Sequence, residues 1–457
     1  MPHAGGSCKL LQCGRNWARQ ARSDDSADLQ DGADAVIPRL LADRRIRYVL
    51  AAYVASGSAD GFLPVVLSFA VLRLTGSPAS LGLVLAGQSA AALLLTLAGG
   101  LAGDRFPRAR ILTGSLAVRA AAAAVLAATL LTGTASFPLL LAMAAMYGCA
   151  DGFFGPASTA LLPDIVPRAQ LAPANALLGG TASTAAIASP AIAGIIVAAL
   201  GPGAGFAVQA AVLTVAAGSV AAARLPAGRP GPPHPLSQLK TGWAEFSRPR
   251  WLWLLTGQWT VFSLVLLAPV AVLGPAIANR YLGGPLAWGI IRSSLSLGAV
   301  AGQLAAGRIR PPARPALRIA WLMPVMTAQA LALGLGAPLA AVAAAAVITG
   351  LAIGLQAVLF QTAMQTSIPP EALARVTAFD LLGSEGGQPI GYALAGPLGA
   401  AIGARTYLTY CAAGIALAAS AFTLLRPLRT ETGTTSPPPT SGEPAAGASG
   451  SRPRTTP

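Results

Sequence analysis

Ionisable residues that lie inside long apolar stretches of the sequence include Asp60, Arg119, Arg292 and Glu385. A charged side chain at the centre of a bilayer costs roughly 2.5 to 3.5 kcal/mol on insertion scales unless it is neutralised, paired or hydrated. Asp60 therefore has three interpretations: it exchanges protons, it forms a fixed pair with Arg119 or Arg292, or it faces water at the end of a helix. Glu385 is the second candidate for proton exchange, and Arg119 is the candidate cation beside such a site.

The composition indicates what surrounds these charges. The 457 residues are 54% hydrophobic and only 10% charged, so lipid must solvate much of the chain. A net charge of +15 raises nucleic acid as a partner. However, the Arg and Lys residues form short clusters between apolar stretches rather than a contiguous basic face, which excludes a nucleic-acid partner.

The apolar stretches predict an all-α polytopic membrane protein with twelve transmembrane helices. Crossing the hydrocarbon core takes about 20 mostly apolar residues. Helices are favoured over strands because the stretches are long, continuous and rich in Ala and Leu. The expected spans are residues 46–72, 80–101, 111–132, 137–157, 176–200, 203–223, 251–279, 286–307, 317–336, 338–362, 377–402 and 406–425.

The distribution of basic residues predicts the orientation of the spans. With a cytoplasmic N-terminus, only Arg73, Arg280 and Arg405 fall in outer loops, whereas inner segments hold most of the 31 Lys and Arg residues. Positive charge concentrates on the cytoplasmic side, so both termini are expected there. The predicted parts are a disordered N-terminus (1–45), a six-helix bundle (46–223), a cytoplasmic linker (224–250), a second six-helix bundle (251–425) and a disordered tail (426–457).

The two predicted bundles carry a weak internal repeat. AGGLAGDRFPRAR at 98–110 is similar to AGQLAAGRIRPPAR at 301–314, and VPRAQLA at 166–172 is similar to IPPEALA at 368–374. Both pairs are displaced by about 200 residues, which indicates a parallel duplication. Two such halves can open a central site alternately to either side of a membrane, so transport becomes the leading function.

The loop between the second and third spans resembles the signature loop of the major facilitator superfamily. Gly100 is followed by Asp104, Arg105 and Arg108, while Pro107 replaces the second Gly of that pattern. The resemblance implies a cytoplasmic latch in which Asp104 faces the N-terminus of span 11. In it, Arg108 bonds a carboxylate near the end of span 4, for which Asp151 is the candidate. The alternative is that these charges only set the topology.

Two further segments resemble the drug and enterobactin exporters of that superfamily. The loop FFGPASTALLPDIVPRAQLAPANAL at 153–177 matches them nearly residue for residue, and the resemblance extends over about 45–426. Ser189, Pro190 and Gly194 in span 5 resemble a degenerate antiporter motif, although ordinary small-residue packing is the alternative. An Arg common in span 4 of proton-coupled drug exporters is missing, and Arg119 in span 3 is its candidate substitute.

Amide side chains are the candidates for lining a substrate cavity. Gln88, Gln258 and Gln356 lie within spans, but periodicity does not show which face they occupy. Hydrogen bonding between helices is their alternative role.

Several classes of site and function are excluded or left without support. The four Cys residues form no CxxC pair and the two His residues lie outside the spans, so no metal site or cofactor is expected. Clustered polar residues of an enzyme site and a GxxxxGK[ST] loop for ATP are both missing. The partners expected are a small-molecule substrate, protons and the lipid bilayer, with the chain as a monomer.

The preferred interpretation is alternating-access export of a small lipophilic or amphipathic molecule, such as a drug, antibiotic or secondary metabolite, by proton antiport. The alternative is an importer or facilitator of a small metabolite, because direction does not follow from the fold. Nearly all of the basic residues are Arg, a coding bias typical of GC-rich bacteria, so the predicted location is a bacterial plasma membrane.

Overall fold

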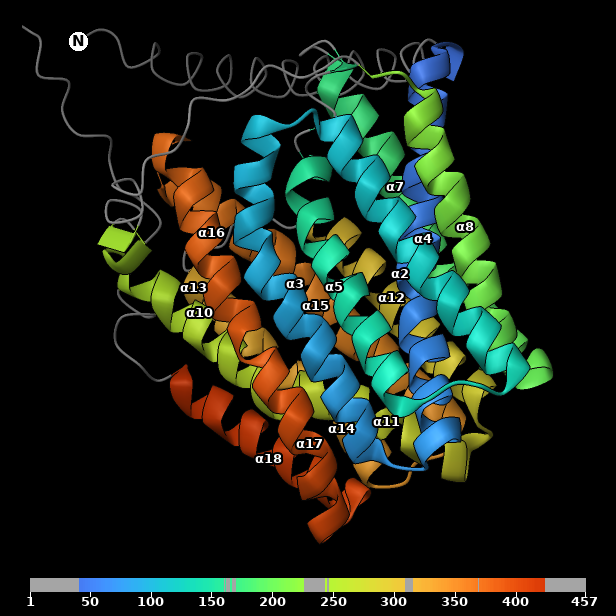
Figure 1. Cartoon of the computed structure of the whole chain (residues 1–457). Coiled ribbons are helices and arrows are strands. Elements are labelled where there is room, and N and C mark those ends of the chain that lie inside the picture. The colour runs from blue at the N-terminus through green and yellow to red at the C-terminus, as the bar shows by residue number, and fades with distance from the viewer. Residues whose placement is uncertain are drawn as a thin grey trace, which may run out of the picture.

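The computed structural model consists of long helices that run back and forth along one direction (Figure 1). It describes residues 41–159, 161, 165–166, 170–225, 243–244, 246–308, 315–368 and 370–423. The predictions for residues 1–40, for 226–242 of the linker and for 424–457 lie outside the described residues. No strand occurs among the described residues, and their helices make twelve passes.

The first half contains six uninterrupted passes. They are α2 (Arg44–Thr75), α3 (Pro78–Arg105), α4 (Arg108–Thr132), α5 (Phe137–Thr159), α7 (Leu171–Leu200) and α8 (Pro202–Ala222). The turns between them are short, and Gly residues with positive φ end α2 and α4, at Gly76 and Gly133. Only a residue without a Cβ atom adopts that left-handed conformation at no steric cost, so these helices end where the sequence places glycine.

The second half also makes six passes, but Pro and Gly interrupt three of them. The interrupted passes are α10 (Arg250–Phe262) with η2 (Ser263–Leu267), α11 (Ala268–Ile277) and η3 (Ala278–Leu282); α13 (Pro315–Leu322) with η4 (Val325–Thr327) and α14 (Ala328–Gly334); and α16 (Pro370–Gly386) with α17 (Gln388–Ile402). The continuous passes are α12 (Pro285–Ala306), α15 (Leu339–Ser367) and α18 (Ala404–Phe422).

Each interruption has a proline next to it. Pro269 follows the π-helical turn η2, Pro324 precedes the 3₁₀ turn η4, and Pro389 lies two residues after the break at Gly387. Proline lacks the backbone N–H and clashes with the carbonyl four residues earlier, which distorts or breaks a helix. The expected span 377–402 is therefore two helices, not one.

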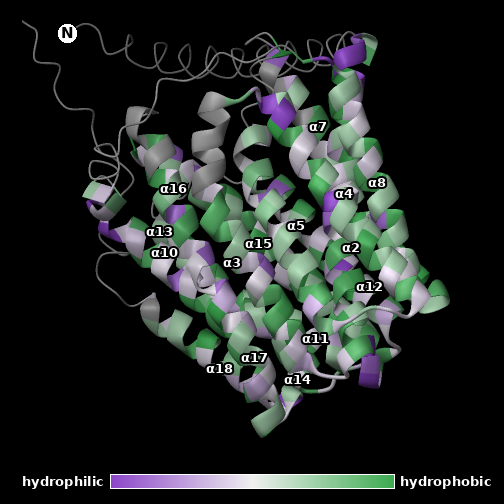
Figure 2. Cartoon of the chain, viewed as in Figure 1, coloured by the Kyte–Doolittle hydropathy of each residue, from purple (hydrophilic) through white to green (hydrophobic). Residues whose placement is uncertain are grey.

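The surface of the helices is suited to a lipid environment. Nine of the described passes meet the length and apolar composition needed to cross a membrane. The other three are α12 and α18, which are less apolar, and α16 with α17, which are each too short alone. Many large apolar side chains are exposed, and Figure 2 shows hydrophobic residues along the helices with hydrophilic residues gathered where α2 begins.

Helices of the two halves meet along two seams, α7 with α12 and α3 with α17. Both seams depend on glycine. A Cβ atom at Gly194 would lie 2.7 Å from the carbonyl oxygen of Pro285, and one at Gly289 would lie 2.5 Å from that of Pro190. In the second seam, Gly82 contacts the carbonyl of Tyr392. Such small residues let helix backbones approach closely.

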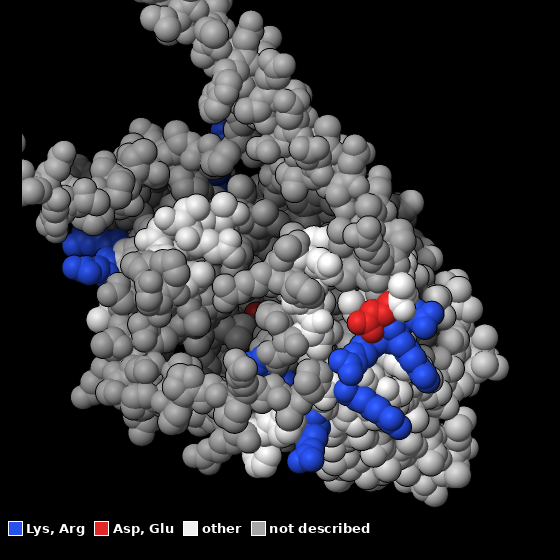
Figure 3. Space-filling model, turned by 90° about the horizontal axis from the view of Figure 1, so that it is seen from above, with Lys and Arg blue, Asp and Glu red and all other residues white. Residues whose placement is uncertain are grey.

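Both seams lie toward one end of the bundle. Gly194 is near the end of α7 and Gly82 near the start of α3, on the side of the α2–α3 turn. The end of the bundle that contains the α2–α3 turn is called the opposite end. The end where α2 begins and α8 ends is called the terminal end. Figure 3 shows the terminal end hollowed near its centre, with an acidic side chain visible inside. The halves are thus joined at the opposite end and separated toward the terminal end.

Candidate functional site

A cavity of about 410 Å³ lies between the two halves. Helices α2, α3 and α5 line it from the first half, and α10 to α12, α14, α15, α16 and α17 line it from the second. Its wall is mostly apolar, with Leu63, Leu67 and Phe262 among the contributors. The polar residues that line it are Ser68, Gln88, Ser89, Asp151, Arg292, Gln329, Thr349, Glu385, Gln388 and Tyr392.

A charged cluster lies in the first half, centred on Arg119 of α4. The Arg119 side chain is fully buried, and its Nη2 donates a hydrogen bond to a carboxylate oxygen of Asp60 on α2. Its Nη1 lies 3.5 Å from an oxygen of Asp151 on α5. The Asp60 and Asp151 side chains are 50% and 47% exposed, so the pair of carboxylates meets open space while the guanidinium does not. One cation therefore serves two carboxylates from two other helices.

Aromatic and amide groups complete the surroundings of Arg119. Its Nη2 also donates to the Tyr147 hydroxyl at 2.6 Å, and the guanidinium lies over the rings of Tyr147 and Phe154. Gln209 of α8 donates to the Ala59 carbonyl at 3.0 Å and to the Tyr147 hydroxyl at 3.4 Å. These contacts hold Arg119 in one position between four helices, because a buried cation requires bonded partners.

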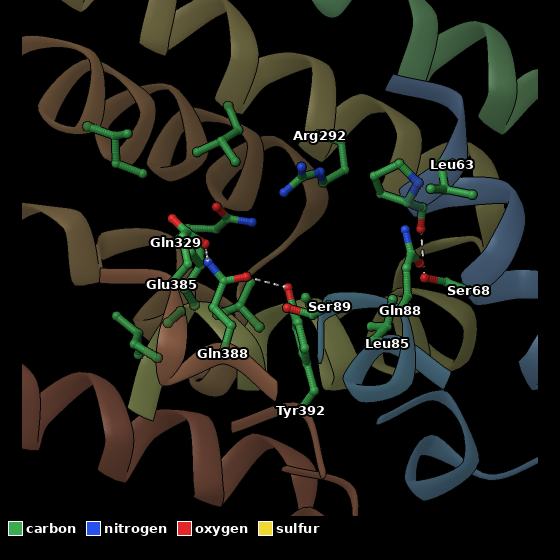
Figure 4. Close-up of a pocket in the computed structure, with 18 of the residues that line it drawn as sticks. Leu63, Ser68, Leu85, Gln88, Ser89, Arg292, Gln329, Glu385, Gln388 and Tyr392 are labelled. Carbon is green, nitrogen blue, oxygen red and sulfur yellow. Dashed lines mark hydrogen bonds between the residues drawn. The ribbon is translucent and has the colours of Figure 1, made fainter. Parts of the chain in front are cut away.

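A second polar group lies in the second half, beside the break at Gly387. Gln388 donates from its amide to the Glu385 carboxylate, and the Tyr392 hydroxyl donates to the Gln388 carbonyl oxygen at 3.2 Å. Deeper in α16, Asp380 accepts a hydrogen bond of 2.5 Å from Thr256 of α10. Figure 4 shows Glu385, Gln388 and Tyr392 together on one side of the cavity. Helix α16 ends just after Glu385, so the break places this carboxylate in the wall of the cavity.

The structure therefore brings Asp60, Arg119 and Asp151 together and places Glu385 in the other half. Of the partners considered for Asp60, the bonded one is Arg119. Asp151, which was expected beside Arg108, lies instead next to Arg119 and lines the central cavity. The reason is its position about 12 Å, or eight residues, before the end of α5, whereas Arg108 begins α4 at the terminal end.

The remaining residues of the expected latch lie where α3 ends. Gly100, Asp104 and Arg105 belong to the last turns of α3, and their side chains are outside the described part of the chain. Arg108 begins α4 after Pro107 and is partly buried. The latch therefore stays a prediction, without Asp151 as its carboxylate.

The small residues of span 5 lie at the seam between the halves. The hydroxyl of Ser189 packs against Gly61 of α2, and Gly194 packs against the start of α12. Pro190 precedes Ala191, whose backbone N–H donates to the Ser293 hydroxyl of α12 at 3.0 Å. These residues thus permit close contact across the molecule, which is what small-residue packing requires.

The three glutamines expected in a cavity occupy three different places. Gln88 lines the central cavity. Gln258 lies in a separate, almost wholly apolar groove of about 280 Å³ between α10 and α18. Gln356 is buried within α15 and is not among the residues that line the cavity. Helical phase decides this, and the sequence signal was too uniform along these spans to reveal it.

Several functional candidates in the cavity did not follow from the sequence. Gln388 contacts Glu385 from the next turn and Tyr392 contacts Gln388, while Gln329 lies in the first turn of α14, just after the 3₁₀ turn beside Pro324. Arg292 was recognisable as a charge within an apolar stretch, but only as a partner for Asp60. Among the described residues, no group of three or more His, Cys, Asp or Glu is arranged to hold a metal ion.

The family model of the Major Facilitator Superfamily matches residues 49–384, which is most of the chain. This chain belongs to the Major Facilitator Superfamily. The expected superfamily and its fold are thereby confirmed. The chain is a multi-pass membrane transporter rather than an enzyme, and its general function is secondary transport of a small molecule.

Curated members of the superfamily are similar over most of their length. Enterobactin exporter EntS of Shigella boydii serotype 18 (strain CDC 3083-94 / BS512) is 30% identical over 352 residues, covering 74% of this chain and 82% of that protein. Enterobactin exporter EntS of Escherichia coli O81 (strain ED1a) is 29% identical over 361 residues, with the same coverage. The relatives support the exporter-like resemblance.

Solved structures share the superfamily fold at low sequence identity. A bacterial homologue of the human lysosomal transporter Spinster, in an inward-facing and unoccupied conformation, gives a TM-score of 0.65 at 15% identity, covering 85% of this chain and 97% of that one. A bacterial homologue of the iron transporter ferroportin, in an inward-facing state, gives 0.65 at 15% identity, covering 82% and 97%. At this identity the likeness concerns the fold alone.

Proposed function

We propose that this transporter exports a small lipophilic or amphipathic molecule, such as a drug, antibiotic or secondary metabolite, by proton antiport and alternating access. The observation that carries the proposal is the pair of half-exposed carboxylates, Asp60 and Asp151, that share the buried Arg119. The curated relatives are named as exporters of a small molecule, which supports the direction. A mostly apolar cavity of about 410 Å³ supports the class of substrate.

The arrangement of the two halves supports alternating access. The seams join the halves at the opposite end, and the terminal end is hollowed (Figure 3). The described basic residues at the terminal end include Arg44, Arg45 and Arg47 at the start of α2. With positive charge on the cytoplasmic side, the cavity opens to the cytoplasm, where an exported molecule has to enter.

The shared arginine offers a way to couple protons to this movement. When both carboxylates are ionised, Arg119 attracts Asp60 and Asp151 and so links α2, α4 and α5. A proton on either carboxylate removes one of these attractions, which changes how tightly the three helices are held. A proton taken up from outside and released inside would then bias the transporter between its two open states. Glu385 is the second site at which this exchange takes place in the other half.

Gradient-driven efflux tests the coupling. A fluorescent lipophilic dye is added outside inverted vesicles that contain the full chain, so that export appears as uptake into the lumen, and transport is measured with and without a pH gradient. Asp60→Asn and Asp151→Asn should each lower gradient-driven transport by at least about tenfold, while dye exchange without a gradient is kept. Asp43→Asn is the matched control, because Asp43 caps α2 from outside the cavity and Asn is an equally good N-cap.

Three results would contradict the proposal. Full gradient-driven activity in both Asp variants would exclude these carboxylates as the coupling site. Dye movement by the wild type only in the direction of uptake into the cell would identify an importer instead. Efflux of several unrelated dyes would support a broad drug exporter, whereas dye binding without efflux would contradict export of this class.

A further inference from the structure

Arg292 is a cation that lines the central cavity and does not belong to the cluster around Arg119. It lies in the middle of α12 and is partly buried in the wall of the cavity. Figure 4 shows its guanidinium directed into the open space, toward the side of the cavity where Glu385 and Gln388 lie. Within the described residues, no carboxylate lies within ion-pair distance of it, and no hydrogen bond from it is found.

The contrast with Arg119 makes this position informative. Arg119 has two carboxylates and a phenol as partners, as a charge within a membrane protein normally requires. Arg292 is fixed on a helix in the wall instead, where the cavity and the nearby Tyr392 phenol supply its surroundings. A charge in such a place is either hydrated or bound to a ligand, and intramembrane charges that face a cavity commonly mark a substrate pathway.

A second donor without an acceptor lies in the same cavity. Gln329 is the second residue of α14 and is 97% buried, being only 3% exposed, yet its Nε2 has no acceptor among the described residues. Its backbone N–H donates to Thr349 of α15 at 3.0 Å, which fixes the position of the residue. Figure 4 shows Gln329 and Arg292 on neighbouring parts of the cavity wall. A buried amide without a partner is costly, so an acceptor from outside the chain fits this site.

The carboxylates of the cavity, in contrast, have donors from the chain itself, whereas Oε1 of Gln88 on α3 has none among the described residues. Glu385 accepts from Gln388, whose own carbonyl oxygen accepts from Tyr392. Asp151, the other carboxylate that lines the cavity, is balanced by Arg119. The groups left over on the α12 and α14 wall are therefore the Arg292 cation and two N–H donors, those of Gln329 and Trp288. A ligand that completes them must offer negative charge and hydrogen-bond acceptors.

We propose that Arg292 and Gln329 bind an anionic group, a carboxylate or a phenolate, of an amphipathic substrate. This inference rests on the proposed function, because it names the polar group of the molecule that is exported. The apolar part of the substrate lies against Leu63, Leu67 and Phe262, which line the same cavity. Export of an anion from a cell with a negative interior is also favoured by the membrane potential, so it is compatible with proton antiport.

Equilibrium binding of three matched probes tests this subsite. The probes share a dansyl group and a five- or six-carbon chain and differ at its end: a carboxylate, the neutral primary amide or a primary ammonium. Binding to the purified full-length protein in lipid nanodiscs is followed by dansyl fluorescence, without any gradient. The carboxylate should bind at least about tenfold more tightly than the amide, and the ammonium should bind most weakly.

Variants show whether Arg292 and Gln329 cause the preference. Arg292→Gln should remove the difference between carboxylate and amide while changing amide binding by less than about twofold. Arg292→Lys should keep part of the difference between carboxylate and amide, because Lys retains the positive charge. This variant controls for the case in which Arg292→Gln fails to fold. Gln329→Leu should weaken the carboxylate by about threefold to tenfold. Arg280→Gln is the matched control, since Arg280 is exposed at the opposite end and should leave all three affinities unchanged.

The outcomes separate this inference from the proposed function. A wild type that binds all three probes equally, or that prefers the ammonium, would overturn the anion subsite, as would an unchanged preference in Arg292→Gln. Because binding is measured without a gradient, such a failure leaves proton-driven efflux untouched. Conversely, a carboxylate preference that depends on Arg292 stands even if the vesicle assay shows no efflux.

Discussion

Arg119 satisfies two carboxylates at once, because Asp60 and Asp151 reach it from different helices. It is fully buried, and it also donates to Tyr147, so its side chain has little freedom to move. Buried ion pairs of this kind are poor evidence for stability but strong evidence for position, since removing one partner leaves the other uncompensated. The two carboxylates of the first half are therefore held by one guanidinium rather than by a motif.

Replacement of Arg119 is the residue-scale prediction. Arg119→Gln should lower the free energy of unfolding by about 3 kcal/mol, at the lower end for a broken buried pair because both carboxylates are half exposed. The measurement is urea or SDS unfolding of the protein in detergent. The double variant Arg119→Gln with Asp60→Asn should recover part of the loss, since one of the two uncompensated carboxylates is gone. Equal stability of wild type and Arg119→Gln would mean that the pair contributes nothing.

At the scale of the helices, proline and glycine residues determine where a helix is interrupted and where two helices pack closely. In the second half, Pro269, Pro324 and Pro389 interrupt three passes, and the break near Pro389 exposes Glu385 to the cavity. Glycines on α7 and α12 do the reverse, since they let two continuous helices pack backbone to backbone across the molecule. The elements thus divide into those that shape the cavity and those that close one end of it.

The seam between α7 and α12 gives the element-scale prediction. Gly194→Ala places a Cβ atom 2.7 Å from the Pro285 carbonyl oxygen, and the backbones must separate to admit it. Transport should fall several-fold, and the free energy of unfolding should decrease by about 1 to 3 kcal/mol, as for overpacking.

A matched control exists on a neighbouring helix. Gly218→Ala in α8 meets no atom within 4 Å, so it should be neutral or stabilise by up to about 1 kcal/mol through helix propensity. Both variants are compared in the same unfolding and dye-transport assays. If Gly194→Ala behaves like Gly218→Ala, the seam is not tightly packed in solution.

The whole molecule presents two joined halves with a cavity that communicates with one end. The seams at the opposite end and the hollow at the terminal end make this state asymmetric (Figures 1 and 3). Which compartment the hollow faces follows from the orientation in the membrane, for which the arginines at the start of α2 are the main indication.

Accessibility to a membrane-impermeant thiol reagent is the prediction at this scale. In a cysteine-free background, Ser89→Cys probes the cavity, Arg44→Cys the terminal end, and Thr134→Cys the exposed α4–α5 turn at the opposite end. Without a gradient, the first two variants should react only from the cytoplasmic side and the third only from outside. Labelling of Ser89→Cys together with Thr134→Cys would contradict the assigned open end.

The amino-acid sequence by itself determined the twelve helical passes, the division into two halves and the superfamily. These follow from local properties: runs of apolar residues long enough to cross a bilayer, glycines that end helices, and loop segments whose residue types are read in order along the chain. It also indicated the embedded charges, because a charge in an apolar run is visible without knowing its partner.

Only the tertiary structure decided which charges meet and which face a cavity. Asp60 had several possible partners and bonds Arg119, while Asp151 left its expected partner Arg108 for the same guanidinium. Gln88 lines the cavity but Gln258 and Gln356 do not, although all three lie in similar apolar runs. The reason is that partner choice depends on helix rotation and on packing between segments 28 or more residues apart, which no local pattern along these Ala- and Leu-rich spans encodes.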